Sequence, residues 1–123
     1  MGDQSHQDGV TVSAVLGTIV WLMSRSKAHK QLRISDLEDR VMPAILLNQF
    51  RIYYKGDAPL ACVLYAKQAA APQTDAFSIP QAAKDWKTGP HVTIADVIAP
   101  FGDPQNVAAH FLSEEAAKTS AQR

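Results

Sequence analysis

The sequence of 123 residues has one cysteine, no excess of either charge and no long apolar run. Because Cys62 has no possible partner in the chain, an internal disulfide is excluded, which predicts a reducing, cytoplasmic location. Twelve basic residues balance twelve acidic ones, so the general electrostatic footprint of a nucleic-acid-binding protein is missing. The most apolar run, residues 12–23, is too short and too interrupted to span a bilayer. We therefore expect no membrane span.

Several motifs of known chemistry are also missing. The first ten residues are polar and lack the basic start of a signal peptide, so none is expected. No glycine-rich loop of either common phosphate-binding type occurs. No two histidines, nor a histidine and Cys62, have the spacing of zinc ligands. We expect neither a bound metal nor a bound cofactor.

The length suits one domain with one core. We predict a single domain over residues 11–118, a disordered N-terminus over 1–10 and a frayed C-terminus over 119–123. Apolar spacing predicts a largely buried helix from Thr11 to about Arg25. A second helix is expected to open at Ser35, with a kink or an early break at Pro43.

The second half of the sequence predicts a small sheet. Residues 49–55 and 60–66 read as a hairpin joined at Gly56 and Asp57, and residues 92–98 read as a third strand. A short helix is expected near residues 80–86, and a last helix after Asp103. The order predicts an α+β fold, with helices packed on a small, mostly antiparallel sheet.

Asp96 is the unusual residue of the third strand. Simple alternation of side chains puts it on one face with Val92, Ile94 and Ile98. A carboxylate on an apolar face loses its water and needs a partner or a shifted pKa. Asp96 could belong to a functional site, or it could be a structural carboxylate that accepts backbone N–H groups of the Phe101–Gly102 loop after the strand.

His29 is the histidine most suited to chemistry. It lies in a polar, basic loop between two apolar helices, and Ser26 precedes it by three residues. A loop histidine held by a rigid scaffold is a common general base. Spacing alone also allows His29 to be an ordinary exposed histidine. We expect the remaining histidines to have no chemical role and Cys62 to be a small core residue.

Four segments in order along the chain resemble a known family. They are WLMSRSKAH (residues 21–29), VMPAILLNQFRIY (41–53), AKDWKTGP (83–90) and IADVIAPFGD (94–103). These resemble the W-L-x-x-x-S-x-x-H, V-L-P-A-I-x-x-N-Q-Y, D-W-x-x-G and I-D-W-I-A-P-F-G-D motifs of the toxin-activating lysine acyltransferases of bacterial RTX toxin systems. The resemblance covers residues 16–111, nearly all of the predicted ordered chain.

The resemblance implies a GNAT-like fold, often as a homodimer, and transfer of a fatty acyl group from acyl-carrier protein to internal lysines of a protoxin. The family's essential histidine and aspartate fall on His29 and Asp96, and its serine falls on Ser26. The glycine turn with which ordinary acetyltransferases bind acyl-CoA is not visible, which agrees with a carrier-protein donor. His29 would then be a general base that Asp96 orients, with a covalent acyl-histidine as the rival mechanism.

The sequence also departs from the family pattern. Val97 replaces a tryptophan, Arg40 stands where the family has an asparagine, and family members continue further after the P-F-G-D motif. These departures leave open a degenerate member that only binds carrier protein or a toxin precursor. A small binding module unrelated to acylation is a third alternative.

Overall fold

The computed structural model describes the backbone of residues 4–121 and the side chains of residues 11–118. The predicted order and the α+β class are confirmed. The elements are α1 (Gln4–Ser24), α2 (Asp36–Arg40), α3 (Met42–Leu46), β1 (Phe50–Lys55), β2 (Ala58–Gln68), the short 3-10 helix η1 (Ala83–Trp86), β3 (His91–Ile98) and α4 (Pro104–Ala121). Within this described part, no helix combines the length and apolarity that crossing a membrane requires.

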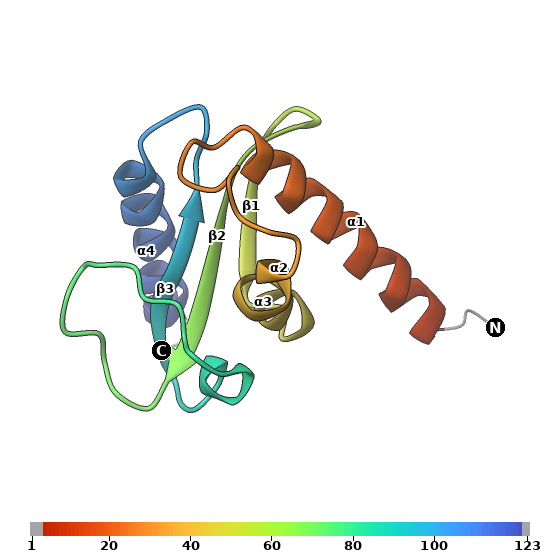
Figure 1. Cartoon of the computed structure of the whole chain (residues 1–123). Coiled ribbons are helices and arrows are strands. Elements are labelled where there is room, and N and C mark those ends of the chain that lie inside the picture. The colour runs from red at the N-terminus through yellow and green to blue at the C-terminus, as the bar shows by residue number, and fades with distance from the viewer. Residues whose placement is uncertain (1–3, 122–123) are drawn as a thin grey trace.

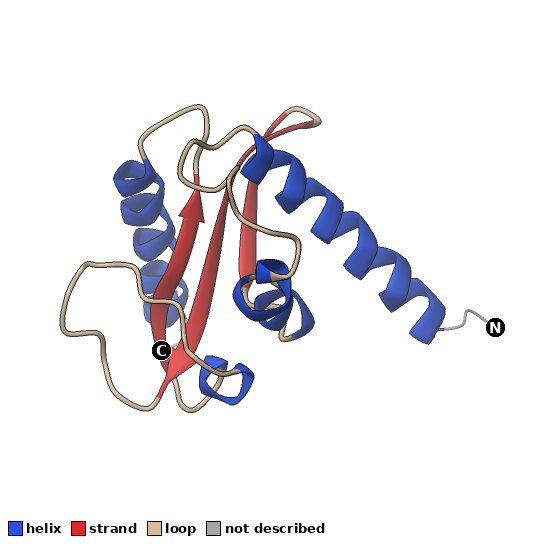
Figure 2. Ribbon diagram, in the orientation of Figure 1, coloured by secondary structure: helices blue, strands red, loops and turns tan. Residues whose placement is uncertain are grey.

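The three strands form one antiparallel sheet in the order β1-β2-β3. Helices α1, α2 and α3 lie on one face and α4 lies on the other (Figures 1 and 2). Each face therefore has its own apolar cluster. The α1 face buries Ile19, Leu22, Val41, Ile45, Cys62, Leu64 and Ile98, and the α4 face buries Val63, Ile94, Val97, Ala108 and Phe111.

A β-bulge in β3 corrects the predicted position of Asp96. Leu64 pairs with Asp96, and the next residue of β2 pairs with Ile94, so Ala95 is the extra residue of β3. A bulge reverses the alternation of side chains beyond it. Ile94 and Val92 accordingly pack in the α4-face cluster, whereas Ala95 and Ile98 pack in the α1-face cluster. The prediction that Asp96 shares a face with Val92 and Ile94 was wrong.

The helices differ from the prediction in burial and at their ends. Helix α1, predicted to be largely buried, buries Ile19, Leu22 and Met23 but leaves many of its other side chains exposed. Helix α1 begins at Gln4, so the described backbone of residues 4–10 is helical, and residues 1–3 lie outside the described part. Ser35 makes no capping bond with its side chain; instead Asp36 Oδ2 accepts the N–H of Arg33 at 2.8 Å. The expected early break occurs at Val41, just before the proline of α3.

The start of α4 follows the prediction. Asp103 precedes the helix, and its Oδ1 accepts the N–H of Gln105 at 2.9 Å, as an N-cap residue does. Pro104 is the first helical residue, where a missing N–H costs nothing. The turn Pro100–Phe101–Gly102 therefore connects β3 directly to a capped helix. At the C-terminus, the described backbone of α4 reaches Ala121.

Candidate active site

A tight turn after α1 carries His29 into the protein. The carbonyl of Ser26 accepts the N–H groups of His29 at 3.0 Å and Lys30 at 2.8 Å, so the chain folds back immediately after the helix. This turn leaves Ser26 7% and His29 6% exposed, although Lys27 and Lys30 beside them are exposed. A polar loop thus places two polar side chains against the sheet.

Both ring nitrogens of His29 have partners. Nε2 lies 3.1 Å from Asp96 Oδ1 and 3.0 Å from Oδ2, and Nδ1 lies 2.6 Å from Ser26 Oγ. An ionised carboxylate only accepts hydrogen bonds, so Nε2 carries the proton of the neutral ring. Nδ1 then has the lone pair and accepts the hydroxyl proton of Ser26. The partner that Asp96 requires is His29, which lies 67 positions earlier in the chain.

Asp96 has two further contacts besides His29. Its Oδ1 accepts the N–H of Val97 at 2.9 Å, and its Oδ2 lies 3.7 Å from Arg40 Nη2. The sequence also allowed a structural carboxylate that accepts backbone N–H groups of the loop after β3. Asp96 accepts one backbone N–H, but that group belongs to Val97 within β3 and not to the loop. Gly102 of that loop donates to Ala99 instead. The bulge at Ala95 turns the carboxylate toward these partners.

Sequence reasoning missed the contact of Arg40 with Asp96. Arg40 ends α2, is about one-third exposed, and has a buried Nε without a hydrogen-bond partner. Nothing in the local pattern of α2 marked Arg40, because its partner Asp96 lies on β3, far along the chain. The only available signal was its departure from the asparagine of the resembled motif.

The lone cysteine is a core residue, as the sequence indicated. Cys62 is fully buried in β2 on the α1 face. Burial raises the pKa of its thiol, and the negative charge of Asp96 raises it further. The thiol therefore stays protonated and is a poor nucleophile.

Two other histidines, His91 and His110, lie away from this cluster. His91 is exposed at the start of β3, and His110 lies on α4 beside Glu114, on the other face of the sheet. The side chain of His6 lies outside the described residues. Within residues whose side chains are described, no three histidine, cysteine or acidic groups gather as metal ligands.

The fold and the cluster define a small α+β protein with a buried histidine held between a serine and an aspartate, an arrangement typical of proton-transfer sites. The sequence model of the RTX toxin acyltransferase family (HlyC) matches residues 8–122, so the chain belongs to that family. The resemblance of the four motifs is thereby confirmed.

Curated relatives agree with this family. The chain is 34% identical over 91 residues to the RTX-II toxin-activating lysine-acyltransferase ApxIIC of Actinobacillus pleuropneumoniae, covering 72% of this chain and 57% of that protein. It is 32% identical over 93 residues to the protein-lysine myristoyltransferase HlyC of Escherichia coli, covering 72% and 54%. A lysine-acyltransferase RtxC of Vibrio cholerae is 27% identical over 100 residues, covering 78% and 65%. The chain thus spans about half the length of the first two relatives.

Proposed function

We propose that the chain transfers a fatty acyl group from acyl-carrier protein to lysine amino groups of a protein toxin. The names of its relatives support lysine acylation and a toxin as acceptor. The structural observation that supports catalysis is His29, 6% exposed, with Asp96 at 3.0 Å on Nε2 and Ser26 at 2.6 Å on Nδ1. This is the environment of an oriented base.

The proposed role of His29 follows from the chemistry of a lysine amine. The amine is protonated near neutral pH and must lose a proton before or during attack on a thioester. Its nitrogen forms a bond to the carbonyl carbon, the carbon–sulfur bond breaks, and the thiolate leaves. The ammonium first loses one proton to solvent. As the neutral amine attacks, His29 takes a second proton at Nδ1, through the Ser26 hydroxyl, and later passes it to the thiolate. Asp96 holds the Nε2–H and stabilises the imidazolium between these steps.

A covalent acyl-histidine is the rival version of this mechanism. It requires Nδ1 itself to attack the thioester, and therefore requires Ser26 to leave its position 2.6 Å from that nitrogen. Rapid quenching with labelled acyl-carrier protein distinguishes the two versions. Label on His29 before any lysine is modified supports the covalent route, and its absence during turnover supports direct transfer.

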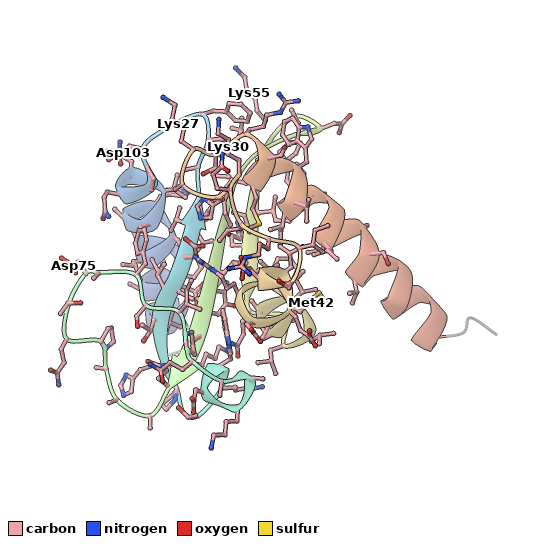
Figure 3. All side chains as sticks on the ribbon, viewed as in Figure 1. Lys27, Lys30, Met42, Lys55, Asp75 and Asp103 are labelled. Atoms are coloured by element: carbon pink, nitrogen blue, oxygen red, sulfur yellow. The ribbon has the colours of Figure 1, made fainter. Side chains whose placement is uncertain are left out.

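The surface around the site fits an acidic carrier protein. Arg25, Lys27, Lys30 and Arg33 are all exposed, and Arg25 lies over the ring of Trp21 at 5.6 Å. Lys27 and Lys30 lie at the same end of the molecule as Lys55 of the hairpin (Figure 3). We expect the affinity for carrier protein to weaken as salt concentration rises, because exposed charges are screened.

A degenerate member that binds without turnover is the second candidate, and Arg40 is the observation that favours it. Its guanidinium lies 3.7 Å from the same Asp96 oxygen that His29 contacts, so it competes for the carboxylate. The test is incubation of the protein with acyl-carrier protein and a toxin acceptor. A lysine mass increase equal to the acyl group supports the enzyme, whereas stable binding with unmodified lysines supports the degenerate binder.

Two finer expectations stay predictions. The resemblance implies a homodimer, which the mass measured by light scattering would test. The cytoplasmic location expected from the lone cysteine would be tested by fractionation of cells that express the protein.

A further inference from the structure

A small apolar pocket adjoins His29 on the α1 side of the site. Its volume is about 130 Å³, and His29 forms part of its wall. The end of α1 contributes Val20 and Met23, and the segment after His29 contributes Leu32 and Ile34. Such a lining suits hydrocarbon and offers little to a polar ligand. We call this cavity the His29 pocket.

The charges at the His29 pocket discriminate between the two substrates of an acyl transfer. Lys30 and Arg33 line it, both are exposed, and no described residue of its lining is acidic. Two cations repel the ammonium group of an acceptor lysine and attract an acidic carrier. The pocket therefore suits the donor and not the acceptor.

Exposed apolar side chains mark the mouth of the His29 pocket. Ile34 is 87% exposed and Val20 is 38% exposed. Burial of such side chains against a hydrocarbon chain removes apolar surface from water and is favourable. These residues give the pocket an apolar entrance that continues to the protein surface.

A larger apolar cavity elsewhere in the protein cannot serve the same purpose. Its volume is about 260 Å³, and it lies among the 72–77 loop, β3 and α4, with Ile94 and Ala108 in its lining. Both residues belong to the α4-face cluster, whereas His29 contacts Asp96 on the α1 face. A chain bound there would be separated from His29 by the sheet.

We propose that the His29 pocket holds the first methylenes of the donor's acyl chain, so that the thioester carbonyl lies at His29 and the donor approaches between α1 and α2. This inference rests on the proposed acyl transfer. Beyond that function, it identifies the acyl donor as the substrate in the His29 pocket and assigns the selection of chain length to the residues that line it.

The test measures binding without turnover, using ethyl, butyl and octyl thioethers of pantetheine as probes in calorimetry. A thioether cannot transfer its chain, so the result does not depend on catalysis. In the unmodified protein, affinity should rise about fourfold for each added methylene until the pocket is filled. Val20→Phe should abolish most of this rise, because the ring occupies the pocket while its position on α1 is partly exposed.

Two variants complete the experiment. Leu112→Phe enlarges an exposed side chain that lines the other cavity, and it should leave all three affinities unchanged. Ile34→Ser is the second pocket variant and serves if Val20→Phe fails to fold. It changes a nearly fully exposed residue and should weaken binding of the octyl probe. Equal octyl affinities in the unmodified protein and in both pocket variants would overturn the inference. The lysine mass assay separately decides whether acyl transfer occurs.

Discussion

Two histidine–carboxylate pairs lie on opposite faces of the same sheet, and they differ in how firmly the ring is held. His29 is buried, contacts both oxygens of Asp96 and has a second partner at Nδ1. His110 is 63% exposed, lies one helical turn from Glu114 and is 3.6 Å from it. Residue types alone therefore do not distinguish a site. Burial and two fixed ring nitrogens do.

The carboxylates of the two pairs also differ in the groups that they contact. Asp96 faces His29, Arg40 and a backbone N–H inside the protein. Glu114 accepts the hydroxyl of Tyr53 and pairs with Arg51, so it ties α4 to β1 at the surface. We assign a chemical role to the first pair and a structural role to the second.

Replacing the histidine of each pair should give the largest difference in acylation rate between the two pairs. His29→Ala should lower the rate of lysine acylation about 10²–10⁴-fold, the usual contribution of a general base. His110→Ala should leave that rate unchanged. Mass spectrometry of the acceptor measures both rates, and circular dichroism shows whether each variant keeps its fold. A folded His29→Ala variant of normal rate contradicts the assignment.

Neutralising the carboxylate should give the next largest effect. Asp96→Asn keeps the size of the side chain but removes the charge that stabilises an imidazolium, so acylation should fall about 10²-fold or more. Glu114→Gln is the matched change on the other face and should not alter the rate. Equal rates in the two variants would show that the environment of His29 is irrelevant.

Loss of the serine hydroxyl should have a smaller effect. Ser26→Ala removes one hydrogen bond to Nδ1 and leaves that nitrogen open to the amine itself. A single hydrogen bond is worth about 1 kcal/mol, or about fivefold in rate. Ser113→Ala removes an exposed hydroxyl that bonds only to the carbonyl of His110 and serves as the control. A complete loss of acylation in Ser26→Ala would contradict this small effect and would show that the hydroxyl itself is required for transfer.

The smallest expected effect is on stability at the surface pair. The hydrogen bond from Tyr53 holds the pKa of Glu114 below its ordinary value, and the charges of Arg51 and His110 act in the same direction. A lowered pKa stabilises the fold above the ordinary value of about 4.3 and loses this contribution as the pH falls below it. The Tm difference between the unmodified protein and Glu114→Gln should be a few degrees at pH 6. Below about pH 4 it should shrink, and a constant difference contradicts this account.

Local patterns in the sequence predicted the elements but not their exact geometry. Apolar spacing, the Gly56–Asp57 turn and the Asp103 cap depend on near neighbours, so they could be predicted. The bulge at Ala95 depends on the register between β2 and β3, which no local pattern contains. It reversed the face of Asp96, and only the resemblance had paired this residue with His29.

The central claim is that Asp96 and Ser26 fix the ring of His29 in one tautomer, which leaves Nδ1 ready to take a proton. Nitrogen-15 NMR of the histidine side chains at neutral pH tests it most directly, with His110 as an internal comparison. Where the ring is neutral, we expect its proton on Nε2 alone at His29 and rapid averaging between the two tautomers at His110. A His29 signal that averages between tautomers, or one with the proton on Nδ1, would contradict it.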